Sequence, residues 1–265
     1  MGSGALLRPG GVLAPAAHRA PPADPPVHRR ATGLVAPRRP AYRGIRGPPA
    51  PPAPCCPRSA PRPAVPGRYR GGMTRIIAGT ARGRRISAPD GRNTRPTSDR
   101  AREALFSSAQ SDLGPLDGLR VLDLYAGSGA IGLEALSRGA AHALLVEADR
   151  KAAQVIRDNI AALGFSGARL ASDRVERVVG QDNPGEPYDL VVADPPYAVT
   201  DDEVAGVLGD LAGRGWLTPD ALVVVERSKR GAEPAWPPGL ELDRSRGYGE
   251  AVLWYARPSP STTLN

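Results

Sequence analysis

The segment Asp194-Pro195-Pro196-Tyr197 carries the residue types best suited to chemistry in this sequence. A carboxylate, together with the Pro195 carbonyl that two prolines keep rigid, can accept both hydrogens of an amino group, and a tyrosine ring can stack on a planar base. An exocyclic amine on a purine or cytosine ring is a poor nucleophile, because its lone pair is delocalised. Acceptors on both hydrogens would aim that lone pair at an electrophilic carbon, and the carboxylate would stabilise the positive charge that develops on nitrogen.

The positions of the cysteines exclude several reaction types and sites. Cys55 and Cys56 are the only cysteines of the 265 residues. Residues 73–265 therefore offer no thiolate to attack a pyrimidine ring at C5, and no disulfide or thiolate zinc site. We expect no metal, and a reducing cytosol as the location.

A glycine-rich segment over residues 123–132 is the second candidate for a site, and it reads DLYAGSGAIG. It follows a predicted strand and opens a predicted helix, where glycine lets the backbone turn sharply and approach a ligand. Gly127, Gly129 and Gly132 also satisfy G-x-G-x-x-G, with the acid Glu147 about 20 residues further on. A nucleotide-like ligand is indicated, and a dinucleotide oxidoreductase is formally allowed.

An alternation of strands and helices positions both segments. Apolar runs predict strands over residues 120–124, 143–147, 167–171, 189–193 and 221–226. Helical spacing is found over residues 130–138, 150–163, 175–179 and 201–213. This pattern is typical of a parallel sheet covered on both faces, with ligands at the carboxyl ends of its strands. Two later strands, over residues 240–244 and 251–256, would add an antiparallel edge.

The net charge of +8 divides unevenly along the chain. Residues 1–72 hold 17 of the 30 prolines and 12 arginines against a single acid, Asp24. We expect this extension to be disordered. It is consistent with an RNA-binding arm, an organelle transit segment, or a start site placed too far upstream. The last is favoured, since Met73 opens the first patterned segment.

A short basic module follows the extension. Residues 73–103 carry eight arginines and a net charge of +5, whereas residues 104–265 sum to −8. Two short strands, over residues 74–78 and 84–88, predict a hairpin, and residues 98–110 predict a helix. A local arginine cluster counters phosphate charge, although a solvated basic face would look the same. The candidate phosphate contacts are Arg82, Arg84, Arg85, Arg95, Arg100 and Arg102.

These motifs together resemble those of the bacterial small-subunit ribosomal RNA guanine-N2 methyltransferases of the RsmD type, which modify the guanine numbered 966 in the usual rRNA numbering. The resemblance covers about residues 74–257 and includes RIIAG and RGRR in the hairpin, RPTSDR with Arg102-Glu103, the glycine segment and Asp194-Pro-Pro-Tyr. The basic hairpin followed by RPTSDR is the more specific part. The 72-residue extension departs from the family pattern.

The resemblance implies a class I fold, a seven-stranded Rossmann-like sheet, and S-adenosylmethionine as methyl donor. Glu147 would then accept hydrogen bonds from the ribose hydroxyls, and Asp173 would lie near the adenine amino group. The implied cofactor-binding residues are Asp123, Tyr125, Ala126, Gly127, Ser128, Gly129, Glu147 and Asp173. The implied substrate is 16S rRNA in the 30S subunit.

The domains expected are the extension over 1–72, an RNA-binding module over 73–113, a methyltransferase domain over 114–257 and a tail over 258–265. No run of 18 or more apolar residues occurs, so we expect a soluble protein that spans no membrane. We also expect a monomer. The competing hypotheses are a DNA or RNA methyltransferase acting on adenine N6 or cytosine N4, and a noncatalytic RNA-binding assembly factor.

Overall fold

The computed structural model describes residues 72–89 and 96–259, all of which fall in one unit. Its strands are β1 (Met73–Arg75), β2 (Arg85–Ser87), β3 (Arg120–Leu124), β4 (His142–Val146), β5 (Ala168–Ala171), β6 (Tyr188–Ala193), β7 (Leu217–Ser228), β8 (Leu240–Tyr248) and β9 (Ala251–Pro258). Its helices are α1 (Pro96–Leu113), α2 (Ala130–Ser137), α3 (Arg150–Leu163), α4 (Val175–Val179) and α5 (Asp201–Gly213).

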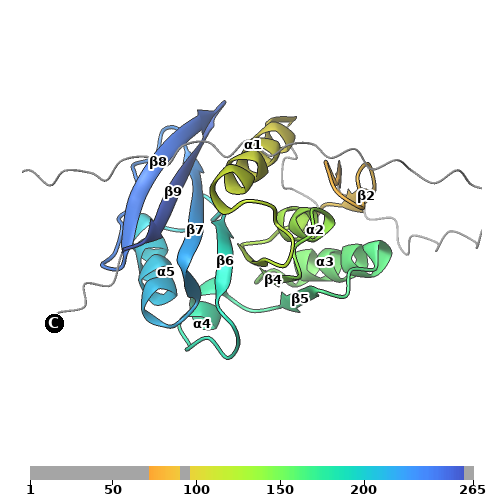
Figure 1. The fold of residues 1–265 in the computed structure, drawn as a ribbon. Helices are drawn as coiled ribbons and strands as arrows, with labels where there is room; N and C mark the ends of the chain where they lie inside the picture. Colours follow the sequence, from red (N-terminus) through yellow and green to blue (C-terminus); the bar gives the residue numbers. More distant parts are fainter. Residues whose placement is uncertain (1–71, 90–95, 260–265) are drawn as a thin grey trace, which may run out of the picture. The chain divides into compact units, whose positions relative to one another are not determined.

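Seven of the strands form one sheet in the order β5-β4-β3-β6-β7-β9-β8 (Figure 1). Strands β3 to β7 are parallel, and β9 pairs antiparallel with both β7 and β8. The chain moves outward from β3 to β5 and then returns to β6 on the other side of β3. A reversal of this kind opens a crevice at the carboxyl ends of the two central strands, where open α/β sheets bind ligands.

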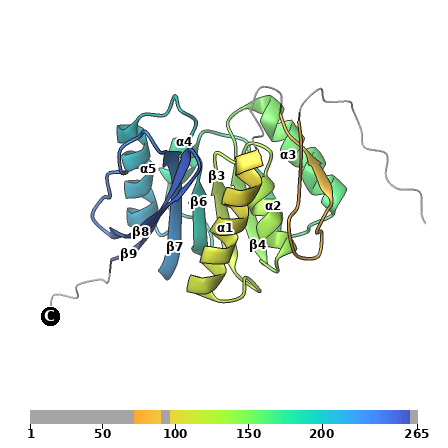
Figure 2. The same ribbon diagram turned by 90° about the horizontal axis from the view of Figure 1, so that it is seen from above.

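Helices cover both faces of the sheet, as the two apolar clusters show. One cluster joins α1, α2 and α3 to the sheet through residues such as Phe106, Leu133 and Ile156. The other joins α4 and α5 to the opposite face through Val175, Val204 and Leu208 among others. Figure 2 shows α1, α2 and α3 lying side by side on their face. The parallel strands are therefore buried on both sides, which explains their nearly continuous apolar runs.

The hairpin of β1 and β2 is fixed to α2 by a buried acid. Glu134 has no solvent-exposed surface, and its two carboxylate oxygens accept the backbone N–H groups of Ile77 at 2.6 Å and Ala78 at 2.8 Å. The Arg138 side chain donates to the same carboxylate at 2.8 Å. A buried carboxylate needs such partners, because its desolvation costs several kcal/mol. Glu134 thus joins the basic module to the sheet unit.

The turn of the hairpin sits directly on the end of α2. The Ser137 hydroxyl accepts from the Ala81 N–H at 2.9 Å and donates to the Ala78 carbonyl at 2.6 Å. Gly79 has φ +78°, and a Cβ at this position would lie 1.7 Å from the Ser137 carbonyl oxygen. Only glycine permits both this backbone conformation and this approach.

The predicted elements are largely confirmed. The boundaries of β3, α3, α4 and α5 agree with the prediction, and the seven-stranded α/β sheet is present. The hairpin strands are shorter than predicted, since the turn uses its backbone groups to bind α2. Helix α1 begins at Pro96, two residues before the predicted start. Strand β7 begins at Leu217 rather than 221, because its first residue pairs with Tyr188 ahead of a register shift.

The predicted module boundary near residue 113 separates segments that share one core. Ile76 and Ile86 of the hairpin region and Phe106 of α1 belong to the same apolar cluster as Leu133 and Leu190. The predicted extension, Gly72 excepted, and most of the predicted tail lie outside the described residues. Within the described part of the chain, no helix has both the length and the apolar character needed to cross a membrane.

Candidate active site

The sequence-predicted residues come together at the carboxyl ends of adjacent parallel strands. Leu124, Val146 and Ala193 are register partners at the ends of β3, β4 and β6. Across the sheet edge, Tyr125 therefore lies between Glu147 and Asp194. The Ala126 N–H donates to the Val146 carbonyl at 2.9 Å, which keeps the glycine segment against β4. The glycine segment and the Pro-Pro segment thus flank the reversal point between β3 and β6.

Two buried acids shape the glycine loop over residues 125–129. Glu147 accepts the Gly127 N–H at 2.7 Å, and Asp123 accepts the Gly132 N–H at 2.9 Å. Both side chains are at most 4% exposed. Hydrogen bonds from backbone N–H groups to a carboxylate are charge-assisted and strong. Glu147 and Asp123 therefore hold the loop and the start of α2 in position at the sheet edge.

The loop fits the close approach of a nucleotide-like ligand. Gly127 and Gly129 have φ +60° and +76°. A Cβ on Gly129 would lie 2.8 Å from Leu145 Cδ2, so a side chain there would push α2 away from β4. The Glu147 carboxylate at the end of β4 has the acceptor chemistry that ribose hydroxyls require. The residues present are therefore compatible with S-adenosylmethionine.

Tyr125 and Asp173 lie on the side of the loop toward β5 and α4. Tyr125 is the one non-glycine residue with positive φ in the described ranges, at 59°. Its hydroxyl donates to Glu176 Oε1 at 3.3 Å, and burial followed by the charge of Glu176 raises its pKa. Asp173, which precedes α4, accepts from the Arg177 guanidinium of that helix at 3.2 Å. Tyr125 thus stays a protonated donor, and Asp173 lies just after β5 as predicted.

The segment Asp194-Pro195-Pro196-Tyr197 leaves the end of β6 and leads into a turn. The Pro196 carbonyl accepts the Val199 N–H at 2.9 Å, which closes the turn ahead of α5. Pro195 is buried, whereas Asp194 is exposed and Tyr197 is 85% exposed. An exposed aromatic ring beside an exposed carboxylate is a suitable platform for a base that comes from outside.

Glu226 is a residue of this edge that sequence reasoning did not select. It follows the apolar run of β7 and lies next to Asp194, since Val225 and Ala193 are register partners. Burial, with a further contribution from the negative charge of Asp194, raises the pKa of Glu226 from 4.5 to about 7. The sequence does show an acid at the end of this predicted strand. An acid in that position is more often a solvated surface residue, so it did not indicate a functional site.

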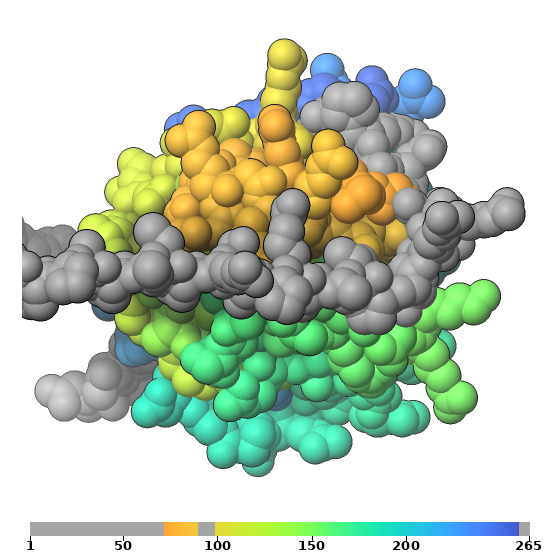
Figure 3. All heavy atoms as spheres, turned by 90° about the vertical axis from the view of Figure 1, so that its right-hand side faces the viewer, coloured from red at the N-terminus to blue at the C-terminus, as the bar shows by residue number. Residues whose placement is uncertain are grey.

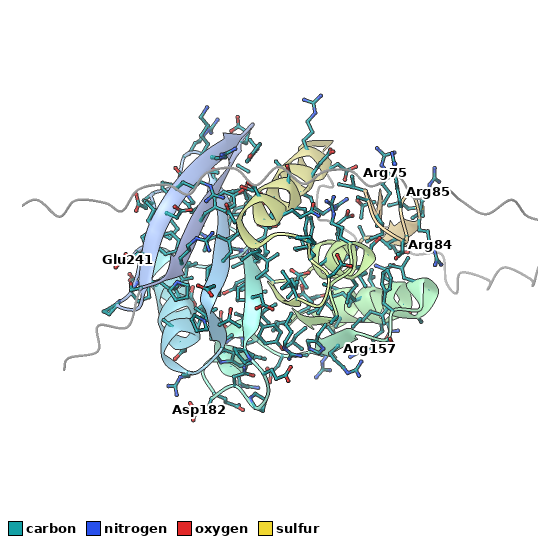
Figure 4. The ribbon with its side chains drawn as sticks, in the orientation of Figure 1. Arg75, Arg84, Arg85, Arg157, Asp182 and Glu241 are labelled. Carbon is teal, nitrogen blue, oxygen red and sulfur yellow. The ribbon has the colours of Figure 1, made fainter. Side chains whose placement is uncertain are left out.

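The candidate RNA-binding arginines fall into two groups. Arg82, Arg85 and Arg100 are exposed, and Figure 4 shows Arg75, Arg84 and Arg85 on the hairpin. Arg102 is instead buried, and its guanidinium donates to the Arg75 carbonyl at 2.7 Å and to Asp99 at 3.0 Å. These contacts give Arg102 a structural role in place of the predicted phosphate contact.

Arg84 and Arg95 complete the predicted set. The Arg84 guanidinium donates to the carbonyls of Ala162 and Leu163 at the end of α3. Cations at this position interact favourably with the last carbonyls of a helix. Arg84 therefore fastens the hairpin to α3 while its side chain remains exposed. Arg95 lies outside the described residues.

Asn159 of α3 connects the hairpin to the glycine loop. Its amide nitrogen donates to the carbonyls of Ser87 and Ser128, and its amide oxygen accepts the Ser87 N–H, each at 2.9 Å. The side chain is 3% exposed, so the three bonds are shielded from water. Ser87 belongs to β2 and Ser128 to the glycine loop, which makes Asn159 a direct link between the two.

We expect Asn159→Ala to weaken S-adenosylmethionine binding several-fold and to lower the free energy of unfolding by about 1 to 3 kcal/mol, because buried polar groups lose their partners. Calorimetric titration and urea unfolding measure the two effects. Asn183→Ala is the matched control, since Asn183 also donates two hydrogen bonds, to Glu186 and Gly215, but in another loop. Equal cofactor affinity in both variants would contradict the link.

Comparison with known proteins identifies the family of the chain. The family model described as Conserved hypothetical protein 95 matches residues 74–257. Ribosomal RNA small subunit methyltransferase D of Escherichia coli is 38% identical over 186 residues, which are 68% of this chain and 88% of that protein. The putative rRNA methyltransferase YlbH of Bacillus subtilis is 33% identical over 66% of this chain and 94% of its own length.

A solved structure supports the same assignment. The putative methyltransferase yhhF from Escherichia coli superposes with a TM-score of 0.62 at 34% identity, covering 71% of this chain and 100% of that one. The predicted methyltransferase fold and the family resemblance are thereby confirmed. The chain belongs to the Conserved hypothetical protein 95 family and is a relative of ribosomal RNA small subunit methyltransferase D.

Proposed function

We propose that this protein transfers the methyl group of S-adenosylmethionine to the exocyclic N2 of a guanine in 16S rRNA, at a position of the 966 type. The observation that carries the proposal is the exposed Asp194-Pro-Pro-Tyr segment beside a tightly held glycine loop at the reversal point of the sheet. The names of the relatives specify ribosomal RNA of the small subunit as the substrate class.

The chain's own residues bind and orient the two reactants. Glu147, the glycine loop and Asp173 would hold the donor, which supplies an electrophilic methyl group. Asp194 and the Pro195 carbonyl would accept the two hydrogens of the guanine amine, so that the nitrogen lone pair points at the methyl carbon. Tyr197 would stack on the base, which is worth about 1 to 3 kcal/mol. The Asp194 carboxylate would also stabilise the positive charge that forms on nitrogen.

The exposed arginines of the hairpin form the RNA-binding surface of this proposal. Arg75, Arg82 and Arg85 are exposed on the hairpin, and Figure 3 shows the hairpin, in orange, on the surface of the face that also carries α3. Arg100 adds an exposed charge from the first turns of α1. Folded RNA is recognised largely through its phosphates and shape, which suits a small basic projection beside the active site.

Replacing Arg82 and Arg85 together by alanine should lower the affinity for 16S rRNA about 10-fold and leave S-adenosylmethionine binding unchanged. The salt dependence should fall as well, by about 0.7 to 0.9 in the slope of log K against log salt for each phosphate that is no longer neutralised. Filter binding at several salt concentrations measures both. Arg214→Ala is the control, since Arg214 is engaged with Asp210 and Asp182 after α5. An unchanged slope would remove the hairpin from the RNA interface.

The competing functions are less well supported. A DNA amino-methyltransferase would use an Asp-Pro-Pro-Tyr segment in the same way. The names of the Escherichia coli and Bacillus subtilis relatives, however, specify ribosomal RNA. A noncatalytic assembly factor would be expected to lose the glycines or the acids, and Asp123, Glu147 and Asp194 are all placed at the sheet edge. A monomeric state is part of this proposal. A ribosomal substrate implies a cytoplasmic protein.

The test is transfer of labelled methyl from S-adenosylmethionine to undermethylated 30S particles, naked 16S rRNA and DNA, followed by nucleoside analysis. N2-methylguanosine in the rRNA samples is the expected product. Label in DNA, or on adenine N6 or cytosine N4, would replace the proposal by the corresponding competitor. Absence of transfer to every substrate would favour the assembly factor.

In the part of the chain that the structure describes, no cluster of three or more potential metal ligands occurs.

A further inference from the structure

Glu226 and Asp194 occupy equivalent positions on neighbouring strands. Ala193 and Val225 are the last register partners of β6 and β7, and the two acids come immediately after them. Val192 and Val224, two residues before each acid, belong to the apolar cluster under α1, α2 and α3. Because side chains alternate along a strand, Asp194 and Glu226 point to that same face. Two carboxylates therefore stand side by side at the active-site edge, one exposed and one half-buried.

The surroundings of Glu226 contain little that would compensate its charge. Its register partner on β9 is the buried Leu253. Leu105 and Phe106 of α1 belong to the apolar cluster on this face, and the buried Arg102 of the same helix is engaged by the Arg75 carbonyl and Asp99. The next cation, Arg227, is bound to Asp201 at the start of α5, which covers the other face. Asp194, just after β6, is the charged neighbour that acts on Glu226 among the described residues.

We propose that Glu226 accepts the proton released by the methylated amine before it reaches water, and that it receives this proton through Asp194. The inference rests on the proposed function. When the N2 lone pair forms the new N–C bond, the electron pair of the broken S–C bond stays on sulfur, and the nitrogen becomes positively charged. Loss of one proton from this nitrogen to Asp194 restores a neutral amine with one methyl group and one hydrogen.

Asp194 and Glu226 have different roles in this mechanism because their environments differ. Asp194 is exposed and lies in the turn that meets the base, so it is suited to hold the amine hydrogens. Glu226 is half-buried and its pKa of about 7 suits a group that takes up and returns protons near neutral pH. The proton thus moves from Asp194 to Glu226, which becomes a neutral carboxylic acid, and from there to water. Glu226 therefore acts on the reaction through Asp194, and its role is to position the proton that leaves the amine.

The experiment is a pH profile of methyl transfer to 30S particles for the wild type and the Glu226→Gln variant. The wild-type kcat should rise as the pH increases through about 7 and level off above it, because only the ionised Glu226 accepts a proton. Glu226→Gln should lower kcat about 100-fold at pH 8 and abolish the rise, with KM for S-adenosylmethionine unchanged. Glu226→Asp should restore part of the rate and a rising limb.

A stability measurement separates this effect from misfolding. A pKa raised from 4.5 to about 7 on folding means that ionised Glu226 destabilises the fold above pH 7, and that this cost vanishes below pH 4.5. Glu226→Gln should therefore melt several degrees higher than the wild type at pH 8 and at nearly the same temperature at pH 4.5. A lower melting temperature at pH 8 would contradict the described burial.

The outcomes distinguish the two proposals. Glu241→Gln is the matched control, since Glu241 is an exposed acid on β8, labelled in Figure 4. Wild-type N2-methylguanosine with an unchanged rate or an unchanged pH profile in Glu226→Gln would overturn the proton-acceptor role alone. A wild type that makes no N2-methylguanosine would overturn the proposed function first.

Discussion

Asp194→Ala should lower kcat for methyl transfer about 1000-fold, a loss of roughly 4 kcal/mol of transition-state stabilisation. Alanine removes an acceptor for the amine hydrogens and the negative charge that faces the developing cation. It leaves the glycine loop untouched, since Glu147 and Asp123 hold that loop. The affinity for S-adenosylmethionine should therefore stay within a few-fold of the wild type. Single-turnover kinetics with 30S particles and calorimetric titration measure the two quantities.

Asp182→Ala is the matched control for this prediction. The Asp182 side chain, labelled in Figure 4, is 91% exposed and makes a 3.6 Å ion pair with Arg214. Asp182 precedes β6, whereas Asp194 follows it. We expect its kcat to equal that of the wild type. If Asp194→Ala retained more than about one tenth of the wild-type kcat, another group would have to orient the amine, and the role of the Pro-Pro segment would be wrong.

Glu134→Ala should lower the free energy of unfolding by about 3 to 5 kcal/mol, which corresponds to a fall in melting temperature of roughly 10 °C. The substitution leaves two hairpin N–H groups and the Arg138 guanidinium without their carboxylate. Unpaired groups of this kind are expensive when buried. Urea unfolding followed by circular dichroism measures the loss.

Two further variants sharpen the Glu134 prediction. Glu134→Gln keeps the shape and one acceptor, so it should cost less than alanine. Glu241→Ala changes an exposed acid of β8 and should alter stability by less than about 0.5 kcal/mol. Because the hairpin carries the exposed arginines, rRNA affinity should fall with Glu134→Ala at temperatures where the sheet is still folded. Stability within about 1 kcal/mol of the wild type would mean that the hairpin is not held by this acid.

Much of the fold was predictable because its signals are local. The strand-helix alternation from residue 120 onward and the glycines after β3 each depend on a few neighbouring residues. The placement of Asp123, Glu147 and Asp194 at one sheet edge followed from the parallel topology alone. Their roles toward the donor and the base stay predictions that the variants above test.

The missed features depend on partners that are distant in the sequence. Glu134 and Asn159 lie within helical patterns where a polar residue is ordinarily solvated, and their partners in the hairpin are 56 to 72 residues away. Arg102 looked like its exposed neighbour Arg100, but it lies under the hairpin. The significance of Glu226 arises from the pairing of β6 with β7, which brings it beside Asp194. The spacing of residues in the sequence does not reveal contacts between distant segments.

The attachment of the hairpin to α2 sets an order for folding during translation. The hairpin leaves the ribosome before the residues that hold it, because Ile77 binds Glu134 57 positions later and Ala81 binds Ser137 56 positions later. An isolated two-stranded hairpin is marginal in water. A nascent chain that ends before α2 therefore has no place to dock its hairpin. Every incomplete chain therefore exposes a basic segment whose backbone N–H groups lack their acceptors until α2 has been synthesised.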